Sequence, residues 1–63
     1  MKYYAEACTS SGKVFDTMEA DHKFEIRVWS VARHADLVNV YQNNADGTLT
    51  LLEVWSYVYG NRG

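Results

Sequence analysis

Alternating aromatic residues near the C-terminus constrain the fold of this chain more than any other feature. Trp55, Tyr57 and Tyr59 are spaced two positions apart, so on a β-strand they share one face. The opposite face of the same strand carries Leu52, Val54 and Val58. A chain of 63 residues buries only about 60% of its unfolded surface and cannot readily cover both faces. We therefore expect the aromatic face to stay partly exposed, as a surface for a partner or a second copy.

The size and composition of the chain predict a single small domain spanning residues 1–63. Hydrophobic residues make up 48% of it, which indicates a packed core rather than a disordered chain. The one cysteine, Cys8, cannot form an internal disulfide, and with His22 and His34 it does not give the spacing of a zinc site. We therefore expect no metal and no cofactor. Association into a homodimer is the remaining common way to stabilise so small a core.

The charge balance is close to neutral. Six basic and eight acidic residues give a net charge of −2, and a general binder of nucleic-acid backbones normally needs a basic excess. The sequence shows neither a signal-peptide pattern nor an apolar run of transmembrane length. A free cysteine fits a reducing compartment. These features predict a cytoplasmic protein without a membrane partner.

Alternating apolar residues and turn residues predict four strands, over residues 2–8, 14–18, 37–42 and 48–59. Gly12 and Gly47 lie in the two turns, where glycine adopts positive φ angles without strain. The second strand is ambiguous because Asp16 and Glu19 have the capping-box spacing that also starts helices. We prefer the strand, since the Val-Phe-Asp-Thr-Met segment favours extended structure.

Residues 22–35 are expected to form the helix, with Asp21 as the N-cap. An apolar stripe runs along it at i, i+4, i+7, i+8 and i+11, and this stripe is expected to face the sheet. The expected core comprises this helical stripe and four strand residues: Phe24, Val28, Val31, Ala32, Ala35, Val38, Val40, Leu52 and Val54.

The resulting prediction is an α+β fold of the form ββαββ, an antiparallel sheet with one helix on one face. The alternative is βαββ, if residues 14–18 begin the helix. The open face of the sheet would show the predicted partner-binding residues Trp55, Tyr57, Tyr59 and Tyr41, with Leu37, Leu49 and Leu51 near its edges. A β-bulge would reverse these faces, because side chains alternate with a period of two.

A secondary basic face is predicted on the helix, formed by Lys23, Arg27, Arg33 and His34. Such a face is most often a solvated surface, but it is also suited to phosphate or to an acidic protein patch. Asp21 and Glu25 stand near the start of the helix and would repel phosphate.

No group of residues has the spacing of a catalytic or nucleotide-binding motif, so we do not expect an enzyme. The leading hypothesis is a small protein-binding module that acts by occupying a surface of a larger protein. The short, tyrosine-rich chain has the general character of accessory proteins of phages and mobile elements, and an anti-CRISPR-like inhibitor of a bacterial defence nuclease is one version. The alternative is a dimeric nucleic-acid-binding regulator that uses the basic helix face.

Overall fold

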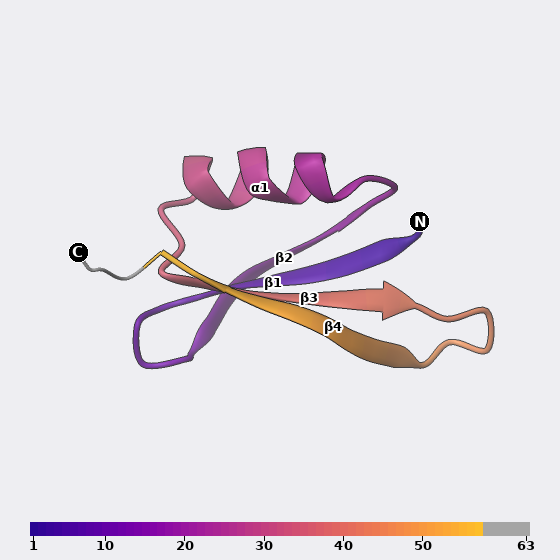
Figure 1. The fold of residues 1–63 in the computed structure, drawn as a ribbon. Helices are drawn as coiled ribbons and strands as arrows, with labels where there is room; N and C mark the ends of the chain where they lie inside the picture. The colour runs from indigo at the N-terminus through magenta and orange to yellow at the C-terminus, as the bar shows by residue number, and fades with distance from the viewer. Residues whose placement is uncertain (58–63) are drawn as a thin grey trace.

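A four-stranded antiparallel sheet with one helix on one face makes up the fold (Figure 1). The computed structural model describes residues 1–57. The elements follow in the order β1 (Tyr3–Cys8), β2 (Val14–Ala20), α1 (Lys23–Ala32), β3 (Leu37–Asn43) and β4 (Leu49–Ser56). The predicted ββαββ fold is confirmed. The βαββ alternative is wrong, because residues 14–20 form a strand.

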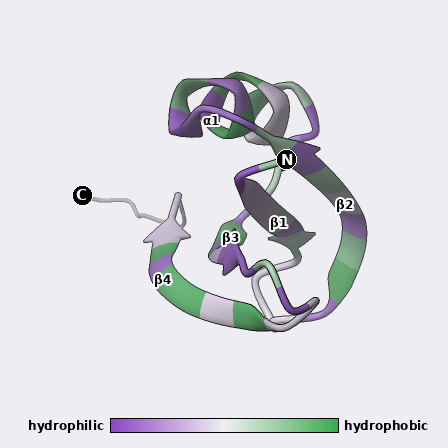
Figure 2. Ribbon diagram, turned by 90° about the vertical axis from the view of Figure 1, so that its right-hand side faces the viewer, coloured by the Kyte–Doolittle hydropathy of each residue, from purple (hydrophilic) through white to green (hydrophobic). Residues whose placement is uncertain are grey.

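Strand order in the sheet is β2-β1-β3-β4, so β2 and β4 are the edges (Figure 2). Both β2 and β3 pair with β1 in the antiparallel sense, and they therefore run parallel to each other. A parallel connection needs a crossover, and α1 provides it by carrying the chain from β2 over β1 to β3. The two hairpin turns contain Gly12 and Gly47 at φ of 92° and 89°, as predicted from the turn residues.

A two-bond capping motif ends α1 three residues before the predicted end. The His34 N–H donates to the Val31 carbonyl and the Ala35 N–H donates to the Ser30 carbonyl, both at 3.0 Å. These are the two hydrogen bonds of a Schellman motif, which requires a left-handed residue after the helix. His34 occupies that position with φ of 57°. At the other end the N-cap is His22 without a side-chain cap bond, so the prediction of Asp21 as N-cap is wrong.

The core lies between α1 and the sheet and is made mainly of small residues. Ile26 on α1 is fully buried with Ala5, Ala7 and Ala20 from β1 and β2. Val38 and Val40 of β3 complete this cluster, as the sequence predicted, together with Ala35. Alanines beneath the helix let it approach the sheet closely, since side-chain volume sets the separation of packed elements.

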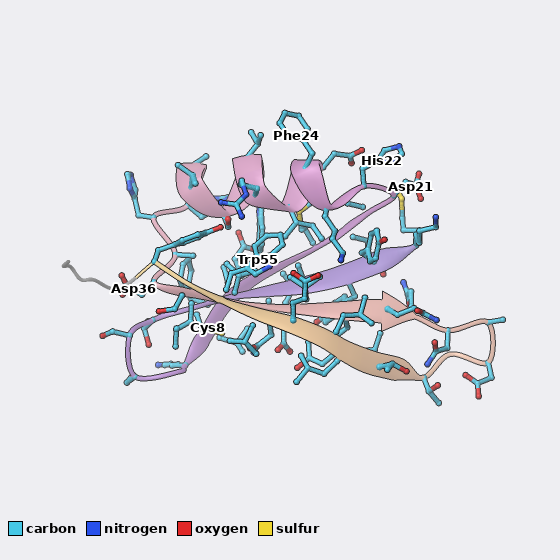
Figure 3. The ribbon with its side chains drawn as sticks, in the orientation of Figure 1. Cys8, Asp21, His22, Phe24, Asp36 and Trp55 are labelled. Atoms are coloured by element: carbon cyan, nitrogen blue, oxygen red, sulfur yellow. The ribbon has the colours of Figure 1, made fainter. Side chains whose placement is uncertain are left out.

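The predicted helical stripe faces solvent rather than the sheet. Phe24, Val28 and Val31 are exposed, as is Ala32, and Figure 3 shows Phe24 pointing away from the sheet. The side of α1 that faces the sheet carries Ile26, Ser30 and the partly buried Trp29. The helix therefore has apolar residues on both sides, and the longer apolar stripe is the outer one.

A β-bulge determines which side chains of β4 face the core. Val38 pairs with Trp55 and Val40 with Glu53, but the next residue, Tyr41, pairs with Leu51. Leu52 is the extra residue, and bulges of this kind shift the alternation of faces. The prediction that Leu52 and Val54 belong to the core is therefore wrong, since both are exposed: Leu52 is the bulged residue and Val54 lies on the outer face of the sheet.

Replacing the buried isoleucine tests this orientation of the helix. We expect Ile26→Ala to lower the free energy of unfolding by about 2–5 kcal/mol, because it leaves a cavity between α1 and the alanines of the sheet. Phe24→Ala is the matched control, and we expect a change of less than about 0.5 kcal/mol, as for most surface sites. Urea denaturation followed by circular dichroism measures both. A larger loss for Phe24→Ala than for Ile26→Ala would reverse the assignment.

The left-handed residue after α1 gives a second test of the fold. His34→Gly is expected to stabilise the protein by about 0.5–1 kcal/mol, because glycine adopts positive φ without the clash that a β-carbon causes. His34→Ala keeps that clash and should give no gain. Urea midpoints of the two variants provide the comparison, and equal stability of both variants would contradict the capping role.

Candidate protein-binding surfaces

The C-terminal end of β4 is bound to α1 by an aromatic and charged cluster. Trp55 lies between the strand and the helix (Figure 3), and its Nε1 donates to Glu53 Oε1 at 2.7 Å. Glu53 Oε2 accepts a hydrogen bond from Lys23 of α1. The Arg27 guanidinium carbon lies 5.1 Å from the centre of the Trp55 ring, within range of a cation–π interaction.

Charge pairing in this cluster shifts two pKa values. The hydrogen bond from Lys23, followed by that from Trp55, holds the pKa of Glu53 below its usual value. The same bond raises the pKa of Lys23. Both side chains are still about 40% exposed, so solvent screens the pair, and it positions the helix on β4 more than it adds stability.

Tyr57 continues the cluster beyond the end of β4. Its hydroxyl lies 3.0 Å from Ser30 Oγ, and Ser30 is fully buried. Ser30 Oγ donates to the Arg27 carbonyl at 2.9 Å, so the tyrosine hydroxyl is the donor in the Ser30–Tyr57 bond. The only polar side chain in the core is thereby satisfied within the described residues.

The prediction of an open aromatic face is therefore wrong for two of its four residues. Trp55 and Tyr57 lie on the helix side of the sheet, partly buried against the core. Tyr59 lies outside the described residues. Tyr41 does lie on the face away from α1, as predicted, opposite Leu51. The assignment of these four residues to partner binding stays a prediction, without the support of a shared open face.

The predicted basic face is largely engaged within the chain. Lys23 pairs with Glu53, and Arg33 Nε lies 3.1 Å from Asp16 Oδ2. Arg27 stacks over Trp55, and His34 caps the helix. Two of the three permanent positive charges are thus beside carboxylates, which lowers the positive potential that a phosphate would experience.

On the outer face of the sheet, a polar cluster occupies the centre. Glu6 Oε1 accepts hydrogen bonds from Asn39 Nδ2 at 3.0 Å and from the Tyr41 hydroxyl at 2.9 Å. The bond to Glu6, followed by burial, raises the pKa of Tyr41. Tyr4 packs against Tyr41 with a centroid separation of 5.9 Å. Beside them Cys8 is buried, and burial raises the pKa of its thiol.

Apolar side chains surround this polar cluster on both sides. The exposed members are Leu49, Leu51, Leu52 and Val54 on β4, with Val14 and Phe15 on β2. In Figure 2 much of β4 has the colour of hydrophobic residues. The outer face is therefore mixed, with a charged carboxylate between two apolar borders.

The second exposed apolar surface is the outer stripe of α1, defined by Phe24, Val28 and Val31. These side chains are 73%, 54% and 58% exposed. Sequence reasoning found this stripe but placed it in the core, so it did not identify it as a binding surface. The missed signal was the presence of Ile26 and Trp29 on the opposite side of the helix, which supplied an alternative face for the core.

Neither a cavity nor a metal-binding group of side chains occurs among residues 1–57. Within the same part of the chain, no helix has the length and apolar character needed to cross a membrane. Comparison with known protein families, curated proteins and solved structures finds no match to this chain. The exposed apolar surfaces are therefore the features of the described residues that indicate a function.

The Glu6–Tyr41 bond is testable by titration. The folded state raises the pKa of Tyr41, so this bond adds stability below about pH 10 that is lost as the pH rises through the folded pKa. We expect Glu6→Gln to lower the pKa of Tyr41 toward its ordinary value, as measured by NMR of ring-labelled tyrosine. Glu19→Gln, on the same face without a bond to Tyr41, is the control. Equal pKa values of Tyr41 in both variants would contradict the assigned bond.

Proposed function

We propose that this protein is a protein-binding module that places the outer stripe of α1 against an apolar surface of another protein. One observation carries the proposal: Phe24, Val28 and Val31 are exposed at i, i+4 and i+7 on a helix whose opposite side is buried. Three apolar residues at this spacing are the usual anchors of a helix that binds in a groove. A cluster of exposed apolar side chains is typical of interaction sites.

The stripe is held on a rigid support. Ile26 fixes the inner side of α1 in the core, the Schellman motif fixes its end, and the Lys23–Glu53 pair ties its first turn to β4. A helix that is already formed loses little conformational entropy when it binds, which favours affinity. The folded sheet therefore serves to present the stripe.

Charged residues border the stripe in the way that interfaces require. Glu25 and Arg27 flank Phe24 and Val28 along the helix and are exposed. Interfaces commonly combine an apolar centre with a polar rim. The partner surface that fits is thus an apolar groove with polar edges.

An inhibitor is one concrete form of this proposal. A module without a cavity among its described residues acts most simply by covering a functional surface of its partner. Under this form the partner is a host protein such as a bacterial defence nuclease, and the stripe of α1 would occupy the surface that the nuclease needs. The support for this finer version is the small size of the chain and the exposed stripe.

The nucleic-acid alternative has weaker support. Its predicted contact residues Lys23 and Arg33 are paired with Glu53 and Asp16, and breaking these pairs would reduce any gain from a phosphate contact. The apolar stripe also has no role in binding a phosphate backbone. Binding to nucleic acid would show a steep dependence on salt.

Site-specific photocrosslinking tests the proposal. Phe24 is replaced by benzoylphenylalanine, and lysate from cells that carry this chain is irradiated with the purified protein. We expect a specific protein adduct that is lost when Val28→Asp is added, because the partner's groove would then face a charge. A loss of about 2 kcal/mol at a central contact weakens binding roughly 30-fold.

Leu51→Asp is the matched control, because Leu51 on the sheet is 54% exposed, as is Val28 on the helix. Circular dichroism confirms that both variants remain folded. If Leu51→Asp removes the adduct and Val28→Asp does not, the stripe is not the binding surface. Adducts with nucleic acid alone would favour the alternative function.

A further inference from the structure

We infer that β4 pairs in the antiparallel sense with β4 of a second copy, giving a two-fold symmetric dimer with one continuous sheet. β4 is an edge strand (Figure 1). Edge strands present unpaired backbone groups that readily pair with another strand unless they are protected. The two edges of this sheet differ in that protection.

Hydrogen bonding at the end of β4 shows which of its backbone groups point outward. The Tyr57 N–H donates to the Asp36 carbonyl at 2.8 Å, toward β3. Backbone direction alternates along an antiparallel strand, and Trp55 is opposite Val38 of β3. The N–H and C=O groups of Val54 and Ser56 consequently point to the free edge.

The opposite edge is protected by its own side chains. On β2 the same alternation points Thr17 and Glu19 outward, and the Thr17 N–H already donates to Asp16 Oδ1 at 2.8 Å. Glu19 adds a negative charge beside it. On β4, by contrast, no side chain of residues 1–57 accepts a hydrogen bond from the N–H of Val54 or Ser56.

Charge favours a second copy as the occupant of the β4 edge. Glu53 is the only charged residue of β4, and Lys23 of the same chain is paired with it. Two β4 strands therefore approach without an unpaired like charge between them, which would otherwise destabilise a cross-strand pair. A head-to-tail contact of β4 with β2 would meet Glu19 and the already bonded Thr17 N–H.

Packing of two outer sheet faces is the competing arrangement. It would bury Glu6 of both copies near the centre of the interface, and Glu6 has hydrogen bonds but no positively charged partner within residues 1–57. An unpaired carboxylate is costly to remove from water. Edge pairing leaves Glu6 solvated and is favoured for that reason.

The bulge at Leu52 limits the regular edge to the end of β4. There, Val54 pairs with the partner's Ser56 and Ser56 with the partner's Val54, so that each pair exchanges two backbone hydrogen bonds. Trp55 then lies opposite the partner's Trp55, and aromatic cross-strand pairs of this kind stabilise strand pairing. The two-fold axis is perpendicular to the sheet, so both α1 helices lie on one side.

The dimer also extends the proposed function. This extension rests on that function, whereas the edge pairing itself does not. Two outer stripes on one side of a joined sheet would engage a repeated or symmetric partner simultaneously. The second contact is then intramolecular, which raises the overall affinity without a new kind of contact.

Light scattering coupled to size exclusion tests the edge pairing with purified protein. We expect the wild type to have the mass of a dimer and Val54→Pro to be a folded monomer. Proline is tolerated in an edge strand where the N–H faces outward, and it removes the donor that the second copy needs. Glu19→Pro makes the matching change on the free edge of β2 and should leave the dimer intact.

Further variants keep the result decisive. If Val54→Pro does not fold, Val54→Lys replaces it, because Val54 is 56% exposed and an edge lysine blocks strand pairing. A monomeric wild type at the highest soluble concentration would overturn the dimer and leave the proposed function standing. Dimers that persist in folded Val54→Pro or Val54→Lys protein, or that are lost in Phe24→Ser, would place self-association elsewhere and overturn the edge pairing.

Discussion

The small side chains beneath α1 are the constraint on which the rest of the structure depends. Ala5, Ala7 and Ala20 are fully buried in the layer that the helix covers, and they let α1 lie close to β1 and β2. Among residues 1–57, Ile26 is the largest side chain that is completely buried, and the larger Trp29 and Trp55 pack against this core only partly buried. The chain has more apolar side chains than this core can hold, and the surplus lies on the outer stripe of α1 and on β4.

The two sides of α1 consequently differ, because the inner side packs on the sheet and the outer side is exposed. The inner side is fixed by Ile26, by the Ser30–Tyr57 bond and by the cation–π contact of Arg27 with Trp55. The outer side carries Phe24, Val28 and Val31 without a covering element among residues 1–57. The outer residues do not contribute to the packing of the helix on the sheet, so they are available for binding. This separation is the physical basis of the proposed function.

Local signals predicted the elements of this fold, whereas long-range packing decided their faces. The turns followed from Gly12 and Gly47, and the strands from alternating residues, because both patterns are read within a few positions. The face of β4 depends on a bulge at Leu52, which is defined by long-range pairing with β3, where Val40 is opposite Glu53 and Tyr41 is opposite Leu51. The face of α1 depends on the alanines of β1 and β2, and apolar residues on both sides of the helix made the longer stripe appear to be the core. The sequence pattern therefore identified the outer stripe of α1 but wrongly assigned it to the core.

The orientation of α1 decides which residues form the core and which form the outer stripe, and nuclear Overhauser effects between methyl and aromatic protons measure this orientation. The structure predicts effects from the Ile26 methyl groups to the β-protons of the buried alanines Ala5, Ala7 and Ala20, because these residues belong to one buried cluster. It predicts no effects from the Phe24 ring to the sheet of the same chain. Strong effects from Phe24 or Val28 to Ala5 or Val40, with an exposed Ile26, would contradict this orientation of the helix.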